Sequence, residues 1–122
     1  MRYMLLIHQN EAELAASAKA TPEAWQALAA DYAAFTEALI KAGGSPGERL
    51  QPVSAATSVR IRDGKTEVID GPYADTKEQF AGYFTVDVPD LDQAIAWAAR
   101  CPSARIGTIE VRPIKEQNGA KA

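Results

Sequence analysis

Two side chains of this 122-residue sequence have the chemistry of an acid/base pair. His8, the only histidine, ends an apolar run, and Asp70 ends a second apolar segment just before a Gly-Pro corner. An imidazole exchanges protons near neutral pH, and a neighbouring aspartate orients the ring and favours its charged form. His8 and Asp70 are therefore candidate catalytic residues. The alternatives are a strand-end histidine that hydrogen-bonds to the backbone and an aspartate that accepts the amides of its own turn.

The polar stretch after Asp70 supplies candidate ligand-binding residues. A carboxylate fixed at a strand end beside a rigid turn is a common way to aim an acid/base group at a ligand. A solvated loop residue is the alternative interpretation of Thr76. The residues that we expect to line one pocket with Asp70 are Gly71, Pro72, Tyr73, Thr76 and Glu78.

The sequence predicts neither a metal site nor a cofactor site. With one histidine and one cysteine in the chain, a zinc site would need mostly carboxylates. The paired glycines Gly43-Gly44 follow a predicted helix rather than a strand, so they do not form a phosphate-binding loop. Any chemistry is therefore expected to be cofactor-independent.

Two predicted strand regions position the candidate pair. Residues 1–8 are apolar on both alternating faces, which is typical of a central strand covered on both sides. Residues 57–62 and 65–70 flank Asp63-Gly64, a strong hairpin signal, and a two-residue turn makes Asp70 face the first residue of the hairpin. Asp70 then shares the apolar face of the hairpin. A carboxylate there must be paired, hydrogen-bonded or next to a cavity.

Two helices and two further strands complete the predicted order. Thr21-Pro22-Glu23 begins a helix with an apolar stripe at steps of three and four, and Gly43-Gly44 ends it. Asp90 begins a second helix, which ends at Cys101-Pro102. Residues 9–20 have no clear period and are expected to form a loop or an irregular helix. The remaining strands are expected at residues 80–88 and 108–114.

This order of elements predicts an α+β fold. Strand, helix, hairpin, strand, helix and strand form a ferredoxin-like sandwich, an antiparallel sheet with two helices on one face. Because the first strand is apolar on both faces, the second face needs a cover, and we expect a homodimer that packs sheet to sheet. The chain is expected to be one domain over residues 1–114, followed by a polar tail at 115–122.

The composition limits the class of protein. Hydrophobic residues make up 47% and charged residues 24%, as in ordinary globular proteins. A net charge of −3 argues against a nucleic-acid partner, and a single cysteine excludes an internal disulfide and suits a reducing cytoplasm. The first apolar run is too short for a signal peptide or a membrane span. We expect a cytoplasmic protein without a membrane partner.

Three groups of motifs in the second half of the chain occur in the order of a known family. They are Asp70-Gly71-Pro72-Tyr73 with Thr76-Lys77-Glu78 and Gly82-Tyr83-Phe84; Asp87-Val88-Pro89-Asp90-Leu91-Asp92-Gln93-Ala94 with Trp97-Ala98 and Arg100-Cys101-Pro102; and Gly107-Thr108-Ile109-Glu110-Val111-Arg112-Pro113. Together they resemble the YCII-related proteins and their DGPF signature, and the match covers residues 1–114. Tyr73 replaces the phenylalanine of that signature but keeps an aromatic ring.

The resemblance implies a dimeric α/β-barrel-type, ferredoxin-like fold and a largely uncharacterised function. It also implies a His–Asp pair in a cleft, which falls on His8 and Asp70 in this sequence. One branch of the family is similar to a dechlorinating enzyme of aromatic degradation, and some relatives are attached to sigma factors.

Three functions are therefore open. The first is a small cofactor-independent enzyme in which His8 and Asp70 transfer protons on a small aromatic or carbonyl-bearing molecule, in a cleft of the dimer. The second is a non-catalytic ligand-binding or transcription-associated regulatory module. The third is a purely structural dimer, which predicts no cavity near His8.

Overall fold

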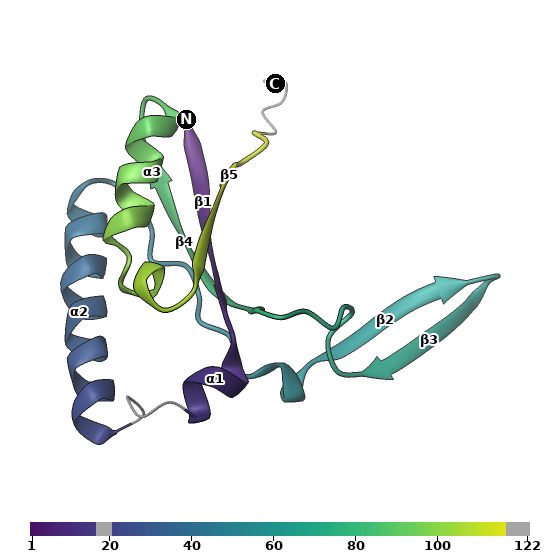
Figure 1. The fold of residues 1–122 in the computed structure, drawn as a ribbon. Coiled ribbons are helices and arrows are strands. Elements are labelled where there is room, and N and C mark those ends of the chain that lie inside the picture. Colours follow the sequence, from purple (N-terminus) through teal and green to yellow (C-terminus); the bar gives the residue numbers. More distant parts are fainter. Residues whose placement is uncertain (17–20, 117–122) are drawn as a thin grey trace.

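The body of the protein is built on a three-stranded antiparallel sheet (Figure 1). The computed structural model describes residues 1–16 and 21–116. Strand β1 (Arg2–Gln9) lies in the centre, between β4 (Gln79–Asp87) and β5 (Thr108–Pro113). The prediction that the first strand is central is confirmed. Of the polar tail expected at 115–122, residues 117–122 lie outside the described part, and Glu116 forms an ion pair with Arg2 at 3.2 Å.

The segment 45–50 runs along the free edge of β4. The backbone N–H groups of Ser45 and Leu50 donate to carbonyl oxygens of β4 at 2.9 and 2.8 Å, so the sheet is extended without a fourth regular strand. Gly47 makes this approach possible. Its φ is +62°, and a Cβ at this position would lie 2.1 Å from the carbonyl oxygen of Tyr83.

Helices α2 (Pro22–Lys41) and α3 (Leu91–Arg100) lie on the same face of the sheet (Figure 1). The predicted caps are confirmed: the Thr21 side chain accepts the N–H of Ala24 at 3.1 Å, and Asp90 accepts the N–H of Gln93 at 3.0 Å. A short helix, α1 (Glu11–Ala16), occupies the middle of the region expected to be a loop or an irregular helix, whose residues 17–20 lie outside the described part.

The core lies between the helices and one face of the sheet. Alternation along β1 directs every second side chain toward the helices, where apolar burial stabilises the fold by roughly 1.5–3 kcal/mol for each large side chain. The buried apolar residues are Tyr3, Leu5, Ile7, Phe35, Leu39, Phe84, Val86, Val88, Ala94, Ala98 and Cys101.

The described part of the chain contains no helix with the length and apolar character needed to cross a membrane.

Strands β2 (Thr57–Arg62) and β3 (Lys65–Asp70) form a separate two-stranded sheet, which projects from the body as an arm (Figure 1). The predicted register is confirmed, with Thr57 opposite Asp70 and the turn at Asp63-Gly64. Both turn residues have positive φ, as a tight hairpin turn requires. The α+β class with antiparallel sheets is also confirmed and is consistent with a ferredoxin-like fold.

Candidate functional site

His8 is paired with a carboxylate on the face of the sheet that the helices leave open. Tyr3, Leu5 and Ile7 point toward the helices, so His8 belongs to the opposite set of side chains. Its Nε2 lies 2.9 Å from Oε1 of Glu110 on β5. Glu110 is placed there because β5 pairs antiparallel with β1, which makes His8 and Glu110 diagonal neighbours on one face.

Two more side chains surround this pair. Nε of Arg112 lies 3.7 Å from the second oxygen of Glu110, so one carboxylate joins the imidazole to a guanidinium. The ring of Phe80 lies with its centroid 5.7 Å from that of His8 and gives the imidazole an aromatic neighbour. The side chains of His8 and Glu110 are 26% and 43% exposed, so both are accessible to a small molecule. The arrangement can accept and return a proton at a partly shielded imidazole.

The carboxylate within hydrogen-bonding distance of His8 is therefore that of Glu110. Asp70 is the last residue of β3, where its side chain is exposed and forms no hydrogen bond or ion pair within the described part of the chain. In the single chain, the apolar face of the hairpin that carries Asp70 is open to water: Val59 and Val68, on the same face, are 63% and 64% exposed. With water beside it, the Asp70 carboxylate needs no buried partner.

The predicted ligand-binding residues form the connection between the arm and β4. The N–H of Gly71 donates to the carbonyl of Ala56 at 2.8 Å, which ties this connection to the base of the arm. Thr76 donates through its hydroxyl to the carbonyl of Glu78 at 2.6 Å, so this part of the loop is held by its own hydrogen bond. Pro72 and Tyr73 border a hollow of about 60 Å³ on the arm. In the single chain, His8 and Asp70 line neither this hollow nor the larger pocket on the other face.

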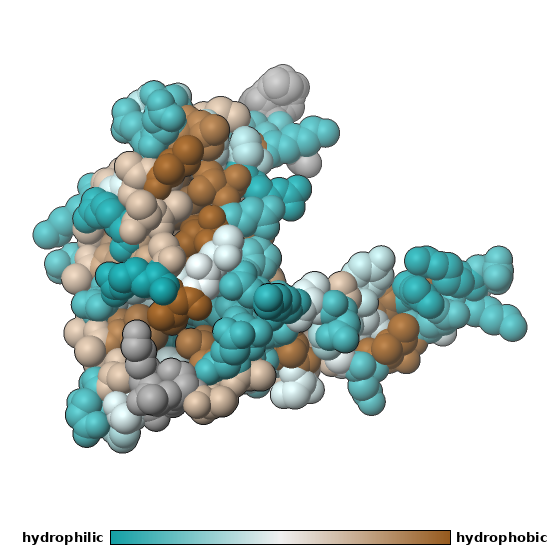
Figure 2. Space-filling view, in the orientation of Figure 1, coloured by the Kyte–Doolittle hydropathy of each residue, from teal (hydrophilic) through white to brown (hydrophobic). Residues whose placement is uncertain are grey.

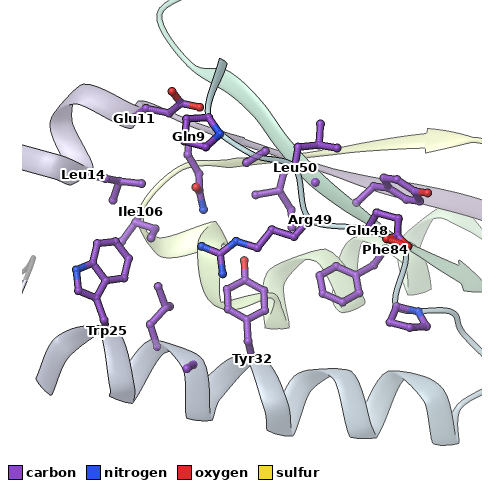
Figure 3. Close-up of a pocket in the computed structure, with 18 of the residues that line it drawn as sticks. Gln9, Glu11, Leu14, Trp25, Tyr32, Glu48, Arg49, Leu50, Phe84 and Ile106 are labelled. Carbon is purple, nitrogen blue, oxygen red and sulfur yellow. The ribbon is translucent and has the colours of Figure 1, made fainter. Parts of the chain in front are cut away.

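That larger pocket, of about 650 Å³, lies between α2 and the helix-covered side of the sheet. Figure 3 shows Arg49, Gln9 and Tyr32 converging on it from three different elements. Beneath them lies the fully buried Ser103, whose hydroxyl accepts hydrogen bonds from Nε2 of Gln9 at 2.7 Å and from the hydroxyl of Tyr32. Burial raises the pKa of Tyr32 above its ordinary value and keeps the phenol protonated.

The structure offers no metal centre within residues 1–16 and 21–116, where no three histidine, cysteine or carboxylate side chains cluster for one ion. The single cysteine, Cys101, is buried in the core, and burial raises the pKa of its thiol. It lies 3.7 Å from the Tyr32 hydroxyl. This residue is therefore a core side chain rather than an activated nucleophile.

Two residues of these sites escaped the sequence-based prediction. Thr108, Glu110 and Arg112 share one face of the last strand. This period-two pattern indicates a polar face but does not show which strand lies next to it. Arg49 lies between the first long helix and the hairpin, in a segment with no periodic pattern.

The comparisons with known proteins agree with this architecture. The sequence model of the YCII-related domain matches residues 1–118. The chain belongs to the YCII-related family. An uncharacterised protein from Rhizobium meliloti (strain 1021) is 35% identical over 117 residues, which cover 93% of this chain and 92% of the relative. These matches establish the family of this YCII-related protein.

Proposed function

We propose that this YCII-related protein is a cofactor-independent acid/base catalyst in which His8 transfers the proton and Glu110 positions it. The observation that carries the proposal is the 2.9 Å contact between Nε2 of His8 and Oε1 of Glu110. Both side chains lie on the sheet face without helices and are partly exposed. Glu110 takes the role that the sequence suggested for Asp70. The aromatic ring of Phe80 beside the imidazole favours a small aromatic or carbonyl-bearing substrate.

The contact with Glu110 assigns separate roles to the two ring nitrogens. In the neutral imidazole, Nε2–H donates to the carboxylate and leaves Nδ1 as the proton acceptor. Nδ1 forms no hydrogen bond within the described part of the chain, so it is the nitrogen that accepts a proton from the substrate. The carboxylate then stabilises the imidazolium until the proton returns to the product.

A homodimer would complete this site. Met4 and Leu6 share the open face with His8, and the described helices α2 and α3 lie on the other face of the sheet. The arm exposes an apolar face as well, and Figure 2 shows apolar side chains on it between polar ones. A second copy that covers both surfaces would turn the open face into a cleft, exclude water from His8 and strengthen its pairing with Glu110.

The activity is tested by hydrogen exchange in D₂O on a panel of small aromatic ketones with an acidic C–H bond, followed by proton NMR. We expect exchange with at least one ketone, slowed by about a hundredfold or more in His8→Asn and less strongly in Glu110→Gln, with a changed pH profile. Glu67→Gln, which removes a carboxylate of the arm, serves as the control. Asp70→Asn tests the other candidate partner of His8.

Three results decide between the candidate functions. Unchanged exchange in His8→Asn, or no exchange with any ketone, rejects the catalytic proposal. Loss of exchange in Asp70→Asn, but not in Glu110→Gln, rejects the role of Glu110. Tight binding without exchange supports the alternative, a ligand-binding or regulatory module.

The dimer is tested separately by sedimentation velocity at micromolar concentration. We expect the wild type to sediment as a dimer and Val68→Lys, which places a charge on the apolar face of the arm, to sediment as a monomer. The matched control is Glu67→Lys, the same new side chain on the opposite face of the same strand, which should remain dimeric. A monomeric wild type contradicts the proposal.

A further inference from the structure

We propose that the pocket between α2 and the sheet is a binding site for a small aromatic carboxylate, which Arg49 holds by its charged end. The pocket has a volume of about 650 Å³, in the range of small-molecule sites. It lies on the helix-covered side of the sheet, so it is separate from His8 and does not depend on the proposed catalysis. The pocket has a suitable shape, aromatic walls and the guanidinium of Arg49, which forms no ion pair with the residues that the structure describes.

A glycine of β4, Gly82, lets the segment that carries Arg49 lie close to the sheet at the edge of the pocket. Phe84 and Val86 point from β4 toward the helices and are buried. The preceding position on the same face is Gly82, where the backbone of Glu48 and Arg49 occupies the space that a side chain would take. A side chain is also excluded there sterically, because a Cβ at Gly82 would lie 2.7 Å from the carbonyl oxygen of Glu48.

The facing helix continues its apolar stripe past the end of the core. Leu39 and Phe35, in the C-terminal half of α2, are buried against the sheet. Tyr32 is partly buried, and Trp25, two steps further along the stripe, is 41% exposed and borders the pocket. A ligand that covers this exposed apolar surface removes it from water, which is favourable in free energy. The aromatic side chains favour a ligand with a flat aromatic ring system.

Arg49 supplies the charge at this site. Its guanidinium reaches into the pocket between Trp25 and Tyr32, and the amide of Gln9 points toward it (Figure 3). Within the described part of the chain, it forms no ion pair and its side chain donates no hydrogen bond. A planar guanidinium binds a carboxylate through two parallel hydrogen bonds, so an anionic group fits this position best.

The two carboxylates of the pocket wall do not neutralise Arg49. The Glu11 side chain accepts the backbone N–H of Val53 at 3.1 and 3.3 Å, which ties it to the wall. The Glu48 carboxylate lies away from the guanidinium (Figure 3). The protonated hydroxyl of Tyr32 adds no negative charge, because it donates to Ser103.

Isothermal titration calorimetry with 2-naphthylacetic acid tests the proposal, with its neutral amide and 2-naphthyl phosphate as matched probes. We expect the acid to bind with one molecule per chain and the amide to bind at least about tenfold more weakly, because it lacks the charge. Arg49→Met keeps an unbranched apolar stem but removes the guanidinium, and it should weaken binding of the acid by at least about tenfold. The control Arg62→Met, at the tip of the arm, should leave binding unchanged.

NMR locates the bound probe. The indole N–H signal of Trp25 should shift on titration, while that of Trp97, which packs against Phe35 and Arg100, should not. The proposal is overturned if the acid does not bind at about 1 mM, if Arg49→Met binds it as tightly as the wild type, or if only the Trp97 signal moves. Tighter binding of the phosphate than of the carboxylate overturns the assigned ligand class.

Discussion

The Glu110→Gln substitution should cost the folded single chain less than about 1 kcal/mol, although it removes a 2.9 Å contact to His8. The side chains of this pair are 26% and 43% exposed, so water screens the attraction and solvates either partner when the other is removed. Double-mutant cycles on such pairs give about 0.2–1 kcal/mol. By contrast, Leu39 is fully buried, and Leu39→Ala should cost about 2–5 kcal/mol.

The assay is urea unfolding at fixed protein concentration, followed by far-UV circular dichroism, for Glu110→Gln, His8→Asn and the double variant. The coupling energy of the cycle isolates the pair from the separate effects of the two substitutions. The cycle is run in the Val68→Lys background, which we expect to be monomeric, and again in the wild-type background. A second copy over the open face would remove water from the pair, so the coupling should be larger in the wild type.

A coupling above about 2 kcal/mol in the monomeric background would refute this reasoning, because only a desolvated pair interacts so strongly. Equal coupling in both backgrounds would argue that the second copy does not cover His8. A small cost in stability combined with a large loss of exchange activity is the pattern expected of a functional pair rather than a structural one.

Three further predictions concern the fold. Gly47→Ala should cost more than Gly64→Ala in urea unfolding: both glycines have positive φ, but only at Gly47 does a Cβ meet a β4 carbonyl oxygen, at 2.1 Å. In alkaline unfolding, the pKa of Tyr32 lies higher in the folded than in the unfolded chain, so its stabilisation should be complete below about pH 10 and be lost as the pH rises further. The pKa of the Cys101 thiol is also raised in the folded chain, so its contribution to the free energy of unfolding should likewise fall as the pH rises above about 9. Tyr32→Phe should reduce the loss of stability above pH 10. Asp90→Ala, which removes the cap of α3, should cost about 1 kcal/mol, measured by thermal unfolding with Asp92→Ala as the control.

Local patterns in the sequence were enough to predict most of the elements. Asp63-Gly64 set both the turn and the register of the arm, because the two positive-φ residues of a tight hairpin turn determine which strand residues face each other. Thr21 and Asp90 marked the helix starts through side chains that bond only to the next turn of backbone. Residues 1–8, which are apolar on both faces, also predicted a central strand with His8 at its end.

The partner of His8 and the pocket became visible only in the folded chain. Glu110 is 102 positions away from His8, and the two meet because β5 lies next to β1, a pairing that depends on how the helices cover the whole sheet. Asp70 was the stronger candidate in the sequence, yet the arm that carries it forms a sheet of its own. The pocket at Arg49 likewise depends on the position of α2 over Gly82. Neighbouring residues determine the local shape of a chain, whereas contacts between distant residues follow from the packing of all its elements together.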